Sequence, residues 1–177
     1  MRSARMRTRN ILLVIGIVAS CASMAADLDN PGDIADQAFV TQAVSTGFAE
    51  IALGKMAAAR SGNVNIKDLG AMMARDHAGA NDELAKLAEA KGIALPDSAS
   101  SEHDQRESAF ESLLPAEFDR RYLDATINDH RQSVLLFQQE IDAGKDPDLR
   151  DFAARTLPVI QKHLGQAEAL KATPAGR

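Results

Sequence analysis

The sequence predicts an all-α fold, a bundle built from four long helices. Ala, Leu, Glu, Lys and Gln dominate most segments, and these residues favour helix. Apolar residues recur at intervals of three and four, which gives a helix one apolar face. No segment alternates Val, Ile or Thr with polar residues as a half-buried strand does. At 177 residues the chain is long enough for one domain with a real core.

Residues 1–26 have the layout of a cleavable secretory signal peptide. Four arginines precede the apolar run 11–18, which is shorter than the roughly 20 residues that span a bilayer. Two cleavage sites stay open. The segment Ser23-Met24-Ala25 fits the small-x-small rule, whereas the segment 18–21 resembles a bacterial lipobox that would lipidate Cys21. We therefore expect a protein of the periplasm or the periplasm-facing outer membrane, attached to a membrane only through Cys21.

The charge of the mature chain argues against several kinds of partner. Residues 1–20 contain four arginines and no acidic residue, so their removal moves the formal charge from −5 to −9. An acidic domain is a poor ligand for nucleic acid or anionic lipid. The single cysteine excludes a disulfide within the chain and a cysteine-based zinc module. Protein partners and self-association stay open.

The first hairpin follows a short polar linker at residues 27–33, and the bundle domain is predicted over 34–172. Asp33 can cap a first helix over 34–60. A turn at Gly62 leads to a second helix, capped by Asn65, that ends at residue 91. Gly92 stands at the position where a left-handed residue closes a helix.

The second hairpin follows a crossover at residues 93–114, in which a short helix is predicted over 98–113. Pro115 begins a third helix that runs to residue 142, since proline suits the first helical turn. Asp146 and Pro147 begin a fourth helix that ends near residue 170. Two hairpins joined by one long crossover make the ferritin-like arrangement of the four-helix bundle.

The core is predicted from the apolar residues that share one face of each helix. In chain order these stripes are Val40, Val44, Phe48, Ile51 and Leu53; Leu69, Met72, Met73, Leu84 and Leu87; Leu123, Ile127, Val134, Phe137 and Ile141; and Phe152, Val159, Ile160, Ala167 and Leu170.

Four polar residues, one on each helix, are predicted to meet in the core. His77, His130 and His163 lie on the apolar stripes of the second, third and fourth helices. Glu50 lies mid-way along the first helix among glycines and apolar residues. A rise of about 1.5 Å per residue places all four within about one turn of the same level. The fourth histidine, His103, lies in the polar crossover and is expected to be solvated.

Three imidazoles and one carboxylate can bind Zn, Fe or Cu. Asp76 and Asp129 each precede a histidine and can hold a ring N–H of a neighbouring one. Met72 and Met73 would favour copper if they pointed inward. The alternative is a structural network without metal, in which the buried histidines fix the register of the helices. No phosphate loop, nucleophile elbow or His-Glu-x-x-His motif points to an enzyme.

A longer pattern resembles a known family. It comprises Asp76-His77 with Asn81 and Glu83-Leu84, Lys91-Gly92-x-x-Leu95-Pro96, Phe118-Asp119-x-x-Tyr122, Asp129-His130 with Phe137, Gly144-Lys145-Asp146, and Thr156-Leu157-Pro158-x-x-x-x-His163-Leu164. Over residues 38–171 the chain resembles the bacterial domain-of-unknown-function family 4142. The resemblance implies a ferritin-like fold and an exported, sometimes lipidated, envelope protein, and it brings no established activity.

The ferritin-like relatives would imply a di-iron centre that includes two Glu-x-x-His pairs. This sequence departs from that pattern, because Ala74, Ile127 and Ile160 stand three residues before the three histidines. A single histidine-rich metal site and a metal-free core both remain compatible with the sequence.

Overall fold

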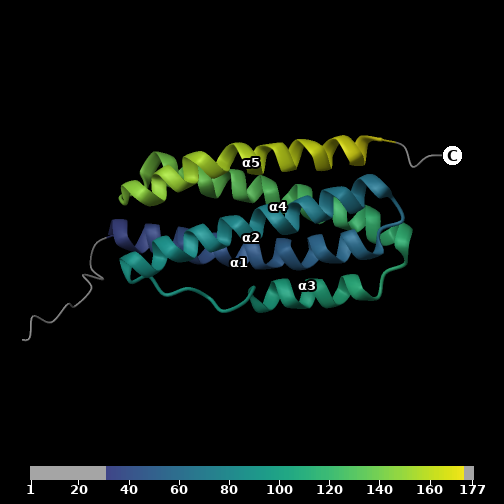
Figure 1. Cartoon of the computed structure of the whole chain (residues 1–177), viewed down its shortest axis with the longest axis horizontal. Helices are drawn as coiled ribbons and strands as arrows, with labels where there is room; N and C mark the ends of the chain where they lie inside the picture. The colour runs from purple at the N-terminus through teal and green to yellow at the C-terminus, as the bar shows by residue number, and fades with distance from the viewer. Residues whose placement is uncertain (1–30, 174–177) are drawn as a thin grey trace, which may run out of the picture.

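The computed structural model describes residues 31–173 and forms an all-α bundle. The predicted signal peptide, Cys21 and residues 27–30 of the predicted linker lie outside these residues. Within residues 31–173 there are five helices and no strand: α1 (Pro31–Arg60), α2 (Val64–Lys91), α3 (Ser101–Glu111), α4 (Pro115–Ala143) and α5 (Pro147–Ala172). Figure 1 shows four long helices lying side by side, with the short α3 along the outer side of α1.

The first hairpin has the predicted turn with two changes at its helix starts. α1 begins at Pro31, three residues earlier than predicted, because proline suits the first helical turn. The cap of α2 is Asn63 rather than Asn65, since the side chain of Asn63 accepts the N–H of Asn65 at 2.9 Å. Gly92 closes α2 in the predicted left-handed conformation, with φ of 68°.

The second hairpin begins and ends close to the predicted residues. α3 occupies the middle of its predicted range, after Ser100 as cap. Pro115 stands at the start of α4, and Gly144 follows its end. Asp146 caps α5, because one carboxylate oxygen accepts the N–H groups of Asp148 and Leu149 at 3.0 and 3.1 Å.

The crossover sets the topology. α1 packs mainly on α2, and α4 mainly on α5. Between the hairpins the chain travels back along the bundle, so α4 begins at the end where α1 meets α2 (Figure 1). Arg60, the last residue of α1, fixes this return by donating to the carbonyls of Phe110 and Leu113, both at 2.9 Å. The predicted bundle of two hairpins with a helix in the crossover is confirmed.

The core divides into two apolar clusters with a polar layer between them. One cluster includes Phe39, Phe137 and Phe152, and the other includes Met73 and Tyr122. Most of the predicted stripe residues are buried or half-buried. Val159 is an exception at 39% exposed, because it neighbours the inward-facing Ile160 and adjacent helical positions point about 100° apart.

None of the helices between residues 31 and 173 combines the length and the apolar character needed to cross a membrane.

Candidate metal centre

Three histidines from three helices converge in the polar layer. The ring centres of His77 (α2), His130 (α4) and His163 (α5) stand 5.4, 5.5 and 5.6 Å apart, so they form a nearly equilateral triangle. One ring nitrogen of each lies within 4.8 Å of those of the other two. His130 and His163 are each 1% exposed, and His77 is half-buried.

The backbone fixes the tautomer of His130. Its Nδ1 lies 2.9 Å from the carbonyl oxygen of Thr126, one turn earlier on α4. A carbonyl only accepts hydrogen bonds, so Nδ1 carries the proton and Nε2 carries a lone pair. That Nε2 is the nitrogen that faces His77. The imidazole of His130 is therefore held with its ligand atom pointing into the triangle.

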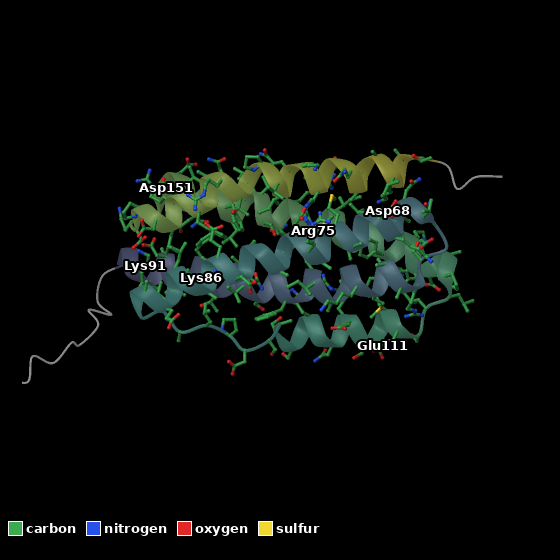
Figure 2. All side chains as sticks on the ribbon, viewed as in Figure 1. Asp68, Arg75, Lys86, Lys91, Glu111 and Asp151 are labelled. Atoms are coloured by element: carbon green, nitrogen blue, oxygen red, sulfur yellow. The ribbon has the colours of Figure 1, made fainter. Side chains whose placement is uncertain are left out.

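A carboxylate fixes the tautomer of His163 in the same way. Its Nε2 donates to Asp76 at 3.1 Å, which leaves the lone pair on Nδ1. Nδ1 is buried and has no hydrogen-bond partner among the described residues. Arg75, labelled on α2 in Figure 2, donates to the same carboxylate at 3.0 Å. Burial opposes ionisation of Asp76, but the hydrogen bonds from His163 and Arg75 outweigh it and lower the pKa of its carboxyl.

His77 completes the triangle at a distance that suits metal ligation. Its Nε2 lies 3.4 Å from Nε2 of His130, longer than an ordinary hydrogen bond. Two nitrogens on a tetrahedral ion, each at 2.0–2.1 Å from the metal, stand about 3.3 Å apart. Burial lowers the pKa of His77 to about 3 and that of His130 to about 4, and it also lowers the pKa of His163. All three imidazoles are thus neutral near pH 7, the state that binds metal.

Glu50 lies behind the triangle rather than within it. Glu50 is 1% exposed, and its Oε1 lies 3.9 Å from Nδ1 of His130. That nitrogen faces the carbonyl of Thr126, away from the other two rings. Burial, followed by the negative charge of Asp129, raises the pKa of Glu50 well above its usual range. Neither carboxyl oxygen has a hydrogen-bond partner among residues 31–173.

Asp129 faces the crossover helix instead of a histidine ring. Arg106 on α3 forms an ion pair with it, at 2.7 Å between Nη2 and Oδ2. Tyr122, one helical turn before Thr126, is fully buried and stacks on the ring of Phe118. Burial and then the charge of Glu50 raise the pKa of its phenol. On this side of His130, the buried Glu50 and Tyr122 thus lie near the partly buried ion pair of Arg106 and Asp129.

Several contacts of the site were not predicted from the sequence. The carbonyl of Thr126 accepts a hydrogen bond from His130 one helical turn later. Any histidine in a helix can make such a contact, so no residue pattern predicts it. The pairing of Arg106 with Asp129 joins residues from different helices, and no spacing rule connects them. Met73 packs into one apolar cluster, and Met72 lies half-buried against that cluster. His103 lies half-buried on α3 and is outside the group of three.

Two solved structures are similar to the chain in fold. One is the crystal structure of a DUF305 fragment from Deinococcus radiodurans, with a TM-score of 0.70 and 15% sequence identity, covering 80% of this chain and 98% of that chain. The other is a conserved hypothetical protein, rv2844, from Mycobacterium tuberculosis, with a TM-score of 0.63 and 16% identity, covering 82% and 97%. At such identities the likeness shows the fold alone.

The comparison with curated proteins gives no significant match. The family model described as Domain of unknown function (DUF4142) matches residues 20–170, which is most of the chain. This match confirms the resemblance seen in the motif pattern. The chain therefore belongs to the DUF4142 family.

Proposed function

We propose that this domain binds one transition-metal ion through His77, His130 and His163. The observation that carries the proposal is the triangle of three rings, two of which have their tautomers fixed from outside. Thr126 accepts a hydrogen bond from Nδ1–H of His130, and Asp76 accepts one from Nε2–H of His163. The other ring nitrogens, Nε2 of His130 and Nδ1 of His163, therefore carry lone pairs. A buried acceptor without a partner costs about 1–3 kcal/mol, and a cation satisfies all of these lone pairs at once. Small rotations of the rings would close the triangle around an ion.

The donor set favours copper or zinc. Imidazole nitrogen suits Zn, Cu, Fe and Ni, and the affinity of such a site for divalent ions peaks at Cu²⁺. Iron in a ferritin-like di-iron centre would need several carboxylates. Glu50 lies on the far side of His130, and Asp129 is paired with Arg106. Metal-binding histidines usually donate their other ring N–H to a carboxylate or a carbonyl, as His163 does to Asp76.

The proposed place of action is the bacterial envelope. The segment 1–26 has the features of an export signal, and the acidic charge of the mature domain disfavours binding to nucleic acid. Cell fractionation combined with N-terminal mass spectrometry tests this part. A mature chain that begins near residue 26, or a lipidated Cys21, would support export. An unprocessed chain in the cytoplasm would overturn it.

The metal content of the purified protein tests the function directly. The full chain is produced without an affinity tag and analysed by inductively coupled plasma mass spectrometry, as isolated and after dialysis against Cu²⁺ or Zn²⁺. We expect about one ion per chain. His163→Asn should lose the ion, because it removes a ligand and keeps a polar side chain of similar shape. His103→Asn is the matched control and should keep it.

Thermal unfolding provides a second, independent test. A ligand at 100 times its dissociation constant stabilises the folded state by about 2.7 kcal/mol. Added Zn²⁺ should therefore raise the Tm of the wild type and of His103→Asn, and leave that of His163→Asn unchanged. If the wild type takes up no ion, and its Tm changes with neither added metal nor added chelator, the three histidines form a structural hydrogen-bond network instead.

A further inference from the structure

A small cavity adjoins the histidine triangle inside the bundle. Its volume is about 30 Å³, and its wall includes His77 together with residues from α1, α2, α4 and α5. A water molecule needs about 10–15 Å³ of such space, so the cavity suits a ligand of one or two heavy atoms. An organic substrate does not fit.

The fourth helix leaves room beside the triangle. α2, α4 and α5 each supply one imidazole, whereas α1 lines the cavity with Ala43, Thr46 and Gly47. Gly47 is buried against Asn81, and a methyl group at residue 47 would collide with that side chain. α1 therefore brings neither an imidazole nor a carboxylate to the cavity wall, since Glu50 is not among the residues that line it.

The wall of the cavity is partly polar. Thr46, Asn81, Ser133 and Thr156 bring hydroxyl and amide groups from the four bundle helices. The amide of Asn81 is itself anchored, since it donates to the carbonyl of Val44 at 3.1 Å. An apolar pocket would hold a hydrocarbon or stay dry, whereas a polar one of this size suits water. The rest of the wall is apolar and includes Leu84, Phe137, Phe152 and Ile160, so a hydrogen-bonding ligand would find its partners on the polar part of the wall.

We infer that the metal keeps a fourth position open toward this cavity for an exchangeable ligand of water size. The inference rests on the proposed three-histidine site. Three protein ligands and one open position distinguish catalytic zinc sites from closed structural ones. Water or hydroxide is the occupant in solution, and a diatomic molecule is the largest ligand that fits.

Pulsed electron paramagnetic resonance of the Cu²⁺-loaded protein in D₂O tests the inference. The full chain is used, and the spectra report both histidine nitrogens and deuterons of a directly coordinated water. We expect both signals in the wild type. Ala43→Val fills the cavity from α1, which supplies no imidazole, and should lose the deuteron signal while keeping the nitrogen signal. Ala38→Val is the control, because Ala38 is exposed on the same helix.

The outcomes separate this inference from the proposed function. Nitrogen signals without coordinated deuterons in the wild type would overturn the open position and leave the metal site standing. Coordinated deuterons that persist in Ala43→Val would show that the ligand enters elsewhere, which also overturns it. Ala80→Val fills the same cavity from α2 and replaces Ala43→Val if that variant fails to fold. A wild type that takes up neither Cu²⁺ nor Zn²⁺ refutes the metal site and the inference together.

Discussion

Replacing Gly70 with alanine tests the close packing of α1 on α2. A β-carbon at Gly70 would stand 2.6 Å from the carbonyl oxygen of Gly54 and 2.8 Å from the β-carbon of Ala57. Carbon atoms pack at about 3.5–4.0 Å, so the two helices would have to separate by roughly 1 Å. Backbone atoms cannot swing aside as the end of a long side chain can. Overpacking of this kind costs about 1–3 kcal/mol.

Gly79→Ala is the matched control on the same helix. A β-carbon at Gly79 would meet nothing within 4 Å. Both substitutions remove a glycine from the interior of α2 and gain about 1 kcal/mol of helix propensity. The propensity gain therefore cancels when the two variants are compared. Gly79→Ala should be more stable than the wild type, and more stable than Gly70→Ala by about 1–3 kcal/mol.

Urea denaturation followed by circular dichroism measures this difference. The two variants should have the same dependence on urea and different midpoints, because only the native packing changes. If Gly70→Ala were as stable as Gly79→Ala, to within about 0.5 kcal/mol, the close approach of α1 and α2 at Gly54 would be refuted.

Three further predictions concern the ends of the bundle and the metal site. Asp36 is buried and accepts two backbone N–H groups of the α4–α5 turn, at 2.9 and 2.8 Å, so Asp36→Ala should cost about 1–3 kcal/mol in urea denaturation. Burial and then neighbouring carboxylates raise the pKa of Glu140 from 4.5 to about 7, so the folded state keeps a proton that the unfolded state loses. The contribution of Glu140 to stability should therefore fall as pH rises from about 4.5 to about 7. The three buried histidines, whose pKa values are lowered, act in the opposite sense below about pH 6.5, so the prediction concerns a difference between variants. Over this range the Tm of the wild type should fall relative to that of Glu140→Gln. Asp76→Asn should weaken metal binding about 10–100-fold in a competition titration, because it weakens the hydrogen bond that orients the ring of His163.

Each of these three predictions has a result that would contradict it. An Asp36→Ala variant of wild-type stability would mean that water replaces the carboxylate without cost. A difference in Tm between the wild type and Glu140→Gln that stays constant from about pH 4.5 to about pH 7 would contradict the raised pKa of Glu140. Unchanged metal affinity in Asp76→Asn would show that the orientation of His163 does not depend on that hydrogen bond.

The helix boundaries could be predicted because their causes are local. Proline, glycine and capping side chains act within one turn of the chain, so Pro115, Gly92 and Asp146 set the ends of their helices without help from the rest of the fold. The cap of α2 shows the limit of such signals, because Asn65 was predicted and Asn63 is the residue that caps the helix. Two asparagines stood two residues apart, and the backbone conformation decided between them.

The meeting of the three histidines also followed from the sequence. Helical rise sets the level of a residue, and helical period sets the face on which it lies. Both are properties of one helix, so His77, His130 and His163 could be placed in the same layer before any tertiary contact was known. Their ring distances of 5.4–5.6 Å agree with that placement.

Contacts between helices could not be predicted in this way. Whether Glu50 lies beside the rings or behind His130, and whether Asp129 faces a histidine or Arg106, depends on the rotation of each helix and on side-chain rotamers. Packing of all the helices together fixes those quantities. The sequence by itself determined the helices, their order and the polar layer. The tertiary structure alone decided which ring nitrogens are bound from outside the triangle and where a cavity adjoins His77, because packing, unlike capping and periodicity, is not a local property.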